Sequence, residues 1–171
     1  MLEMYTRLRD LDFSMLMDLY AEGNEENAKD LYPNESLQSG ILMAQQDFYR
    51  YLADDFFRQE GAVYCVWRVD GIYVSALRLE PYRDGLLLEA LETHPLYRRK
   101  GYAAELVGTV ISELTANSPT RVYSHVSKGN VASLKTHHKC GFVRVAEHAA
   151  YIDGSVSQSA CTLCLQVPSA E

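Results

Sequence analysis

Three consecutive β-prone runs, joined by short turns, constrain the fold of this chain most strongly. The runs Ala62–Val69 and Ile72–Leu79 are separated by Asp70-Gly71, a dipeptide strongly favoured in two-residue β-hairpins. A second turn at Arg83-Asp84-Gly85 leads into a third run, Leu86–Thr93. Short turns join antiparallel strands, because parallel strands need a long crossover. This segment therefore predicts a three-stranded antiparallel meander.

Hydrophobic patterns on both sides of the meander predict further strands and helices. We expect strands at Leu2–Leu8, Arg121–Val126, Val143–Tyr151 and Ser159–Val167. Four segments show helical patterns: Asp12–Tyr20, a segment from Asn34 or Ser36 to about Gln59, a segment that starts close to Gly101, and Asn130–Cys140. The polar stretch Glu22–Asp30 breaks the pattern between the first two. The order predicts an α/β (α+β) fold with a central mixed, mostly antiparallel sheet of about seven strands flanked by four helices. We expect one domain over residues 1–171.

The charge balance and hydropathy argue against two classes of partner. Lys and Arg total 16 against 23 Asp and Glu, which gives a net charge of -7 and disfavours a nucleic-acid-binding surface. No apolar run approaches the roughly 20 residues of a membrane-spanning helix, and Met1–Asp10 lacks the apolar stretch of a signal peptide. We expect a cytoplasmic protein, monomeric or homodimeric, with neither nucleic acid nor membrane as partner.

The four cysteines are expected to be ordinary reduced thiols. Cys161 and Cys164 form a C-x-x-C pattern, but positions i and i+3 of a strand point to opposite faces, which suits a shared metal poorly. No metal site is predicted.

The segment after Leu86–Thr93 has the character of a phosphate cradle. Arg98-Arg99-Lys100-Gly101-Tyr102-Ala103 opens a helix, and a helix N-terminus offers unpaired backbone N–H groups and a partial positive charge to an anion. Gly101 has no Cβ to obstruct that approach, and the small Ala103 keeps the first turn uncrowded. The three basic side chains suit an anion with several phosphates.

Two motifs in this order resemble the GCN5-related N-acetyltransferase (GNAT) superfamily. Arg98, Gly101 and Ala103 match its pyrophosphate loop Q/R-x-x-G-x-G/A, and the segment Asn130–Phe142 is similar to its second motif. The resemblance covers about Ala62–Gln166 and implies a GNAT-like acyl-CoA N-acyltransferase fold. It also implies transfer of an acetyl or other acyl group from acetyl-CoA to a primary amine by direct attack, without a metal.

The resemblance also implies which residues bind coenzyme A. Backbone groups of the fourth strand would hold the pantetheine and the thioester carbonyl, and the loop and the second motif would hold the remainder. The candidates are Leu91, Glu92, Thr93, Arg98, Arg99, Lys100, Gly101, Tyr102, Ala103 and Asn130.

Three residues are candidates for proton transfer. His137 occupies the position where the family usually has a Tyr that protonates the leaving thiolate; it could be that acid, or it could only pack near the cofactor while Tyr102, Tyr123 or water donates. Glu89 and Glu92 are candidates for the general base. Strand alternation places these two carboxylates on opposite faces, unless a bulge near Leu91 intervenes.

The acceptor is the least constrained part of the prediction. The family layout assigns its pocket to about Leu11–Gln59 and Tyr151–Ser159, and a small-molecule or peptide amine is expected. Because His137 replaces the usual Tyr, an acyl-CoA-binding module with weak or no turnover is the alternative.

Overall fold

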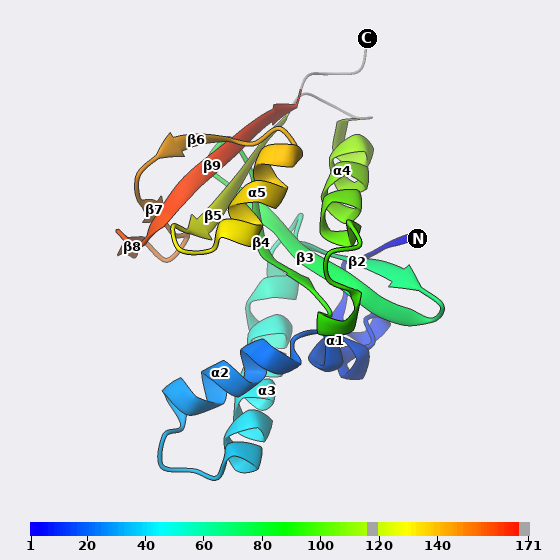
Figure 1. Cartoon of the computed structure of the whole chain (residues 1–171), viewed down its shortest axis with the longest axis vertical. Helices are drawn as coiled ribbons and strands as arrows, with labels where there is room; N and C mark the ends of the chain where they lie inside the picture. Colours follow the sequence, from blue (N-terminus) through cyan, green and yellow to red (C-terminus); the bar gives the residue numbers. More distant parts are fainter. Residues whose placement is uncertain (116–119, 168–171) are drawn as a thin grey trace.

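The computed structural model describes residues 1–115 and 120–167, which are organised around one seven-stranded sheet (Figure 1). Its order is β1-β2-β3-β4-β5-β9-β6. The strands are β1 (Leu2–Tyr5), β2 (Val63–Val69), β3 (Ile72–Tyr82), β4 (Gly85–Thr93), β5 (Thr120–Ser127), β6 (Val143–Ala146) and β9 (Ala160–Val167). The β4–β5 pair is parallel and the other pairs are antiparallel. The predicted mixed, mostly antiparallel sheet is confirmed, as is the meander.

Five α-helices occur in the described ranges, and none of the helices there is long and apolar enough to cross a membrane. They are α1 (Phe13–Leu19), α2 (Ala21–Leu31), α3 (Leu37–Asp54), α4 (Tyr102–Thr115) and α5 (Val131–Lys139), with short 3-10 turns at η1 (Leu8–Asp10), η2 (Phe56–Arg58) and η3 (Pro95–Tyr97). Helices α1, α3 and α5 begin at side-chain caps: Asp12, Ser36 and Asn130 each accept a hydrogen bond from the backbone N–H three residues later.

The polar stretch Glu22–Asp30 is helical, so the expectation of four helices was one too few. Most of α2 is exposed, but Asn24 and Ala28 are buried. A Cβ added to Gly40 of α3 would lie 3.1 Å from the Ala28 Cβ, so the two helices approach closely at small residues. Tertiary packing against α3 therefore stabilises a helix whose own apolar stripe is too narrow to reveal it.

The second half of the chain also departs from the expected boundaries. One strand was expected at Val143–Tyr151, but β6 ends at Ala146 after a register shift against β9. The chain then forms a separate two-stranded sheet from β7 (Ala149–Ala150) and β8 (Val156–Ser157).

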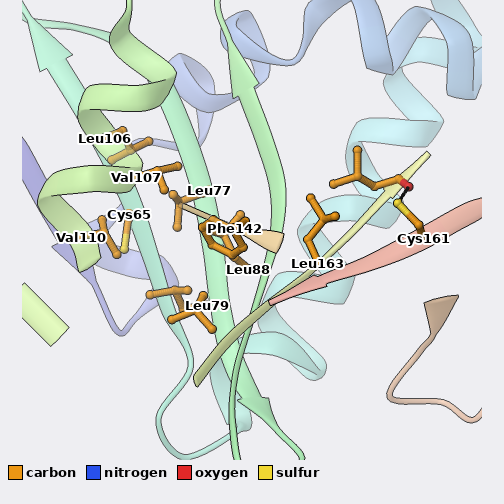
Figure 2. Packing of buried hydrophobic residues seen from close by; sticks show 12 residues of the cluster. Cys65, Leu77, Leu79, Leu88, Leu106, Val107, Val110, Phe142, Cys161 and Leu163 are labelled. Atoms are coloured by element: carbon orange, nitrogen blue, oxygen red, sulfur yellow. Dashed lines mark hydrogen bonds between the residues drawn. The ribbon is translucent and has the colours of Figure 1, made fainter. Parts of the chain in front are cut away.

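Two apolar clusters lie on the two faces of the main sheet. On the α4–α5 face, Phe142 packs among Leu77, Leu88 and Val107 (Figure 2). On the other face, α1, α3 and η2 pack on β2 and β3 around residues such as Leu52, Phe56 and Tyr64. Cys161 belongs to the first cluster and Cys164 to a smaller one beside Tyr82, so the two thiols do not share a site. No group of three His, Cys, Asp or Glu side chains in the described ranges could hold a metal ion.

A β-bulge in β4 determines where its two carboxylates point. Ala76 pairs with Glu92 and Arg78 pairs with Glu89, so Ala90 and Leu91 together oppose the single residue between Ala76 and Arg78. Ala90 has a φ of 51°, an uncommon conformation for a residue with a side chain. Because Ala76 and Arg78 lie on one face of β3, Glu89 and Glu92 share that face of β4. The bulge near Leu91 is therefore present, and the two carboxylates do not lie on opposite faces as strict alternation would require.

Strands β4 and β5 separate just before this bulge. Their pairing runs from Leu86 with Val122 to Leu88 with Ser124 and continues no further. The unpaired ends open a gap in the middle of the sheet, beside the N-termini of α4 and α5.

Candidate active site

A cleft of about 400 Å³ lies where the end of β4 meets the N-terminal parts of α4 and α5. We call it the α4–α5 cleft. It is lined by Leu91, Glu92, Thr93, Tyr97, Arg98, Arg99, Gly101, Tyr102, Ala103, Ala104, Asn130, Ala132, Ser133, Thr136 and Lys139. Of the ten candidates for coenzyme A binding, Lys100 alone is missing; its ammonium lies 4.9 Å from the centroid of the Tyr97 ring.

Several lining residues were not predicted. On α5 these are Ala132, Ser133, Thr136 and Lys139. They follow Asn130 at helical spacing, so extending the helical face beyond Asn130 could have identified them.

The loop before α4 has a backbone suited to an anion. Gly101 has a φ of +89°, and a Cβ added there would meet nothing within 4 Å, so its surface facing the cleft is open. Arg99 also has a positive φ, of 61°. Helix α4 begins immediately afterwards, and its first intrahelical bond joins the Glu105 N–H to the Gly101 carbonyl at 3.0 Å. The earlier N–H groups of the turn have no such partner within the helix.

The basic side chains of this loop differ in their partners. Arg99 and Lys139 line the cleft and form no ion pair with any carboxylate in the described ranges. Arg98 instead contacts Glu22 of α2 at 2.6 Å and Glu92 at 3.2 Å, and its Nε donates to the Thr93 carbonyl. Arg98 thus ties the loop to α2 and β4, and Arg99 and Lys139 are left to attract an anion.

A second hollow, of about 140 Å³, occupies the gap between β4 and β5, and we call it the β4–β5 slit. Its lining comprises Leu88, Glu89, Ala90, Leu91, Ser124, His125, Val126, Ser127, Asn130, Ser133 and His137. Leu91, Asn130 and Ser133 line both hollows, so the slit adjoins the α4–α5 cleft. The two hollows bring Glu89 and His137 together with the loop at Gly101.

His137 is buried in the wall of this slit. Its Nδ1–H donates to the Ser133 carbonyl at 2.9 Å, which leaves Nε2 as the nitrogen that carries the lone pair of the neutral ring. Nε2 is buried without a hydrogen-bond partner in the protein, and the ring packs edge-on against Phe142. Burial lowers the pKa of His137, and the hydrogen bond to Ser133 opposes this only in part. The imidazole is therefore neutral at neutral pH.

Glu89 lies in a buried network on the opposite side of the slit. Arg78 donates to its carboxylate at 3.3 Å, and the Arg78 guanidinium is held over the rings of Tyr51 and Phe56. Glu80, which is 3% exposed and accepts a hydrogen bond from Gln59, lies close by. Burial and the Glu80 carboxyl outweigh the attraction of Arg78 and raise the pKa of Glu89 to about 7.

Comparison with known proteins shows the family. The model of the acetyltransferase (GNAT) family matches residues 17–142, about three quarters of the chain. The chain belongs to the GNAT family. A search of curated proteins finds no match.

Solved structures agree with the fold of this GNAT protein. The ribosomal-protein-S18-alanine N-acetyltransferase from Escherichia coli has a TM-score of 0.64 at 16% identity, over 100% of this chain and 97% of that one. Aminoglycoside 6'-acetyltransferase type Ii gives 0.63 at 11% identity, over 100% and 99%. The PaiA N-acetyltransferase from Thermoplasma acidophilum, solved in complex with coenzyme A, gives 0.59 at 13% identity, over 97% and 99%. The family and the fold are those of acyltransferases that use acyl-CoA.

The bulge of this GNAT protein is held by two tyrosines that the sequence patterns did not reveal. The Tyr20 hydroxyl donates to the Ala90 carbonyl at 2.8 Å and accepts from the Tyr64 hydroxyl at 2.9 Å. Burial raises the pKa of Tyr20 to about 12, so it stays protonated and able to donate. Tyr20 is 70 residues from Ala90 in sequence, so no local pattern reveals the contact.

Glu92, the second candidate base, has a different environment from Glu89. Its carboxylate accepts from the Thr93 N–H at 3.1 Å and from Arg98 at 3.2 Å, and its side chain is 40% exposed. These contacts engage Glu92 at the edge of the α4–α5 cleft, away from the buried network around Glu89.

Proposed function

We propose that this protein is an N-acetyltransferase that transfers an acetyl group from acetyl-CoA to a primary amine by direct attack. One observation carries the proposal: Glu89, whose pKa is raised to about 7, lines the β4–β5 slit, and this slit adjoins the α4–α5 cleft with its open helix N-terminus and unpaired cations. A base next to an anion-binding cleft suits a reaction between an amine and a cofactor that carries phosphates.

Each part of the α4–α5 cleft would have a separate role. The backbone around Gly101 would bind the pyrophosphate, with Arg99 and Lys139 adding charge. Backbone groups of Leu91–Thr93 would orient the thioester, and the bulge held by Tyr20 would keep them rigid.

Glu89 would act at the amine. A substrate ammonium loses a proton to Glu89, directly or through a water, and the amine nitrogen then attacks the thioester carbonyl. The carbon–sulfur bond breaks, the attacking nitrogen loses its second proton as the amide forms, and the departing thiolate takes up that proton, directly or through water. Glu89 suits the role better than Glu92, because it is more buried and lies within the slit.

An assay of thiol release tests the proposal directly. We expect acetyl-CoA and a panel of primary amines to release free coenzyme A at a rate that depends on the amine. Binding of coenzyme A without turnover of any amine would instead support the acyl-CoA-binding module, and longer acyl-CoA substrates in the same assay would define the acyl preference.

We expect the neutral imidazole of His137 to help position the cofactor. We do not expect it to protonate the thiolate. Burial lowers the pKa of His137, so the imidazole is mostly neutral in the pH range where Glu89 is ionised. His137→Phe keeps an aromatic ring against Phe142, and we expect kcat to fall by less than about 10-fold, short of the 10²–10⁴ typical of a lost acid or base. A larger fall, with loss of a descending limb from the pH profile of kcat, would assign the acid to His137.

A further inference from the structure

A third hollow is lined by none of the residues of the α4–α5 cleft or the slit. It measures about 340 Å³ and is lined by Pro81, Tyr82, Arg83, Ala150, Tyr151 and Ile152. One wall is the end of β3 with the turn into β4, and the other is the chain around and after β7. We call it the Arg83 hollow.

Arg83 is the one charged residue of this lining. Its guanidinium carbon lies 5.0 Å from the centroid of the Tyr82 ring and 5.7 Å from that of Tyr123, so two aromatic rings support it. The neighbouring carboxylate, Asp84, is already engaged by Arg121 and by the Tyr123 hydroxyl. Arg83 therefore keeps its hydrogen-bond donors free of any described carboxylate.

Unpaired cations are few in this acidic protein. Ten of its 16 Lys and Arg residues form an ion pair, which leaves six, and all 16 lie in the described ranges. The six are Arg7, Arg83, Arg99, Lys100, Lys135 and Lys139. Arg99 and Lys139 line the α4–α5 cleft, where we propose that phosphates bind, and Arg83 alone lines a different hollow.

Aromatic rings lie between the Arg83 hollow and the β4–β5 slit, which have no lining residue in common. His125 lines the slit together with Glu89, and its ring contacts Tyr82 and Tyr151 at centroid distances of 5.5 and 5.0 Å. Its Nε2–H donates to the Ala150 carbonyl at 3.0 Å. Tyr151 is also close enough to Glu89 for the carboxylate to help raise the pKa of the tyrosine. A molecule with one end at Glu89 could thus extend past these rings toward Arg83.

We propose that the acceptor is an amino carboxylate, whose amine lies at Glu89 and whose carboxylate binds Arg83. The two groups are separated by a linker that contacts Tyr82 and Tyr151. The planar guanidinium matches a carboxylate in geometry, and the aromatic rings hold it in place before binding. This inference rests on the proposed acetyltransferase function and adds the class of acceptor.

Matched acceptors with and without the carboxylate test the inference. The ω-amino acids from 4-aminobutanoate to 8-aminooctanoate would be compared with their carboxamides in the thiol-release assay. For the best length we expect kcat/KM of the acid to exceed that of the amide by about 10-fold, the effect of one hydrogen-bonded charge at a partly exposed site. Arg83→Gln should lower kcat/KM of the acid to that of the amide, and Arg83→Lys should restore part of the preference. Arg7→Gln, at another unpaired arginine that lines none of these hollows, should retain the preference.

The outcomes separate this inference from the proposed function. Turnover of acids and amides at equal rates, or a preference that survives Arg83→Gln, would overturn the role of Arg83 and leave the acetyltransferase intact. If no amine is acetylated, the proposed function fails, and the carboxylate site is then tested by calorimetry of the same amino acids in the presence of coenzyme A. Amino-acid binding that is weaker in Arg83→Gln than in the unmodified protein would support the site. Equal binding by the two proteins, or no binding by either, would refute it.

Discussion

Replacing Glu89 by glutamine is expected to lower kcat/KM for the amine by about 10²- to 10³-fold, the usual contribution of a general base. Glutamine has nearly the same shape but cannot accept the proton. The α4–α5 cleft does not include Glu89, so the affinity for coenzyme A, measured by calorimetry, should be unchanged. Glu92→Gln is the comparison on the same face of the same strand. If it costs more activity than Glu89→Gln, the base is Glu92.

The pH profile of the unmodified protein gives an independent test of Glu89. The carboxylate accepts a proton only when ionised, and its pKa in the free protein is raised to about 7, so kcat/KM should increase with pH, reach half its maximum near pH 7 and level off above it. Glu80 is one of the groups that raise this pKa. Glu80→Gln should therefore shift the rise to lower pH, whereas Glu89→Gln should remove it. A rise that neither substitution moves would come from another group.

Replacing Gly101 by alanine is expected to weaken coenzyme A binding by roughly 10-fold. An L-residue in the left-handed region costs about 1–2 kcal/mol, and Gly101 has a φ of +89°. With nothing within 4 Å of the added Cβ, the free loop can relax away from this conformation, and binding must then restore it. The cost therefore appears in the Kd, which calorimetry measures.

Gly71→Ala is the matched control for Gly101→Ala. Gly71 has a φ of +82° in the β2–β3 turn, and a Cβ there would also meet nothing within 4 Å, but it lies outside the cleft. Gly71→Ala should leave the Kd for coenzyme A unchanged, whereas Gly101→Ala should raise it. Equal affinities in the two variants would show that the loop does not bind the cofactor.

Features encoded by neighbouring residues could be predicted from the sequence. The Asp70-Gly71 turn, the start of a helix at Asn130, and the strand, loop and helix around Gly101 each depend on a few adjacent residues. Such segments favour the same backbone whatever surrounds them. They were sufficient for the sheet, the family resemblance and a set of ten candidate residues, nine of which line the α4–α5 cleft.

Features that depend on distant contacts required the tertiary structure. Helix α2 forms because Ala28 packs against Gly40 of α3, although its own sequence is polar. Glu89 and Glu92 share a face because of a bulge whose carbonyl is held by Tyr20, 70 residues away. The raised pKa of Glu89 results from burial and from the nearby Glu80 carboxyl, which together outweigh the lowering effect of Arg78. The sequence alone thus determined the fold class and the loop before α4 that we propose binds the pyrophosphate, through local backbone preferences. Only packing between remote segments decided which carboxylate is the better candidate for the base, because burial and charge proximity are properties of the folded chain.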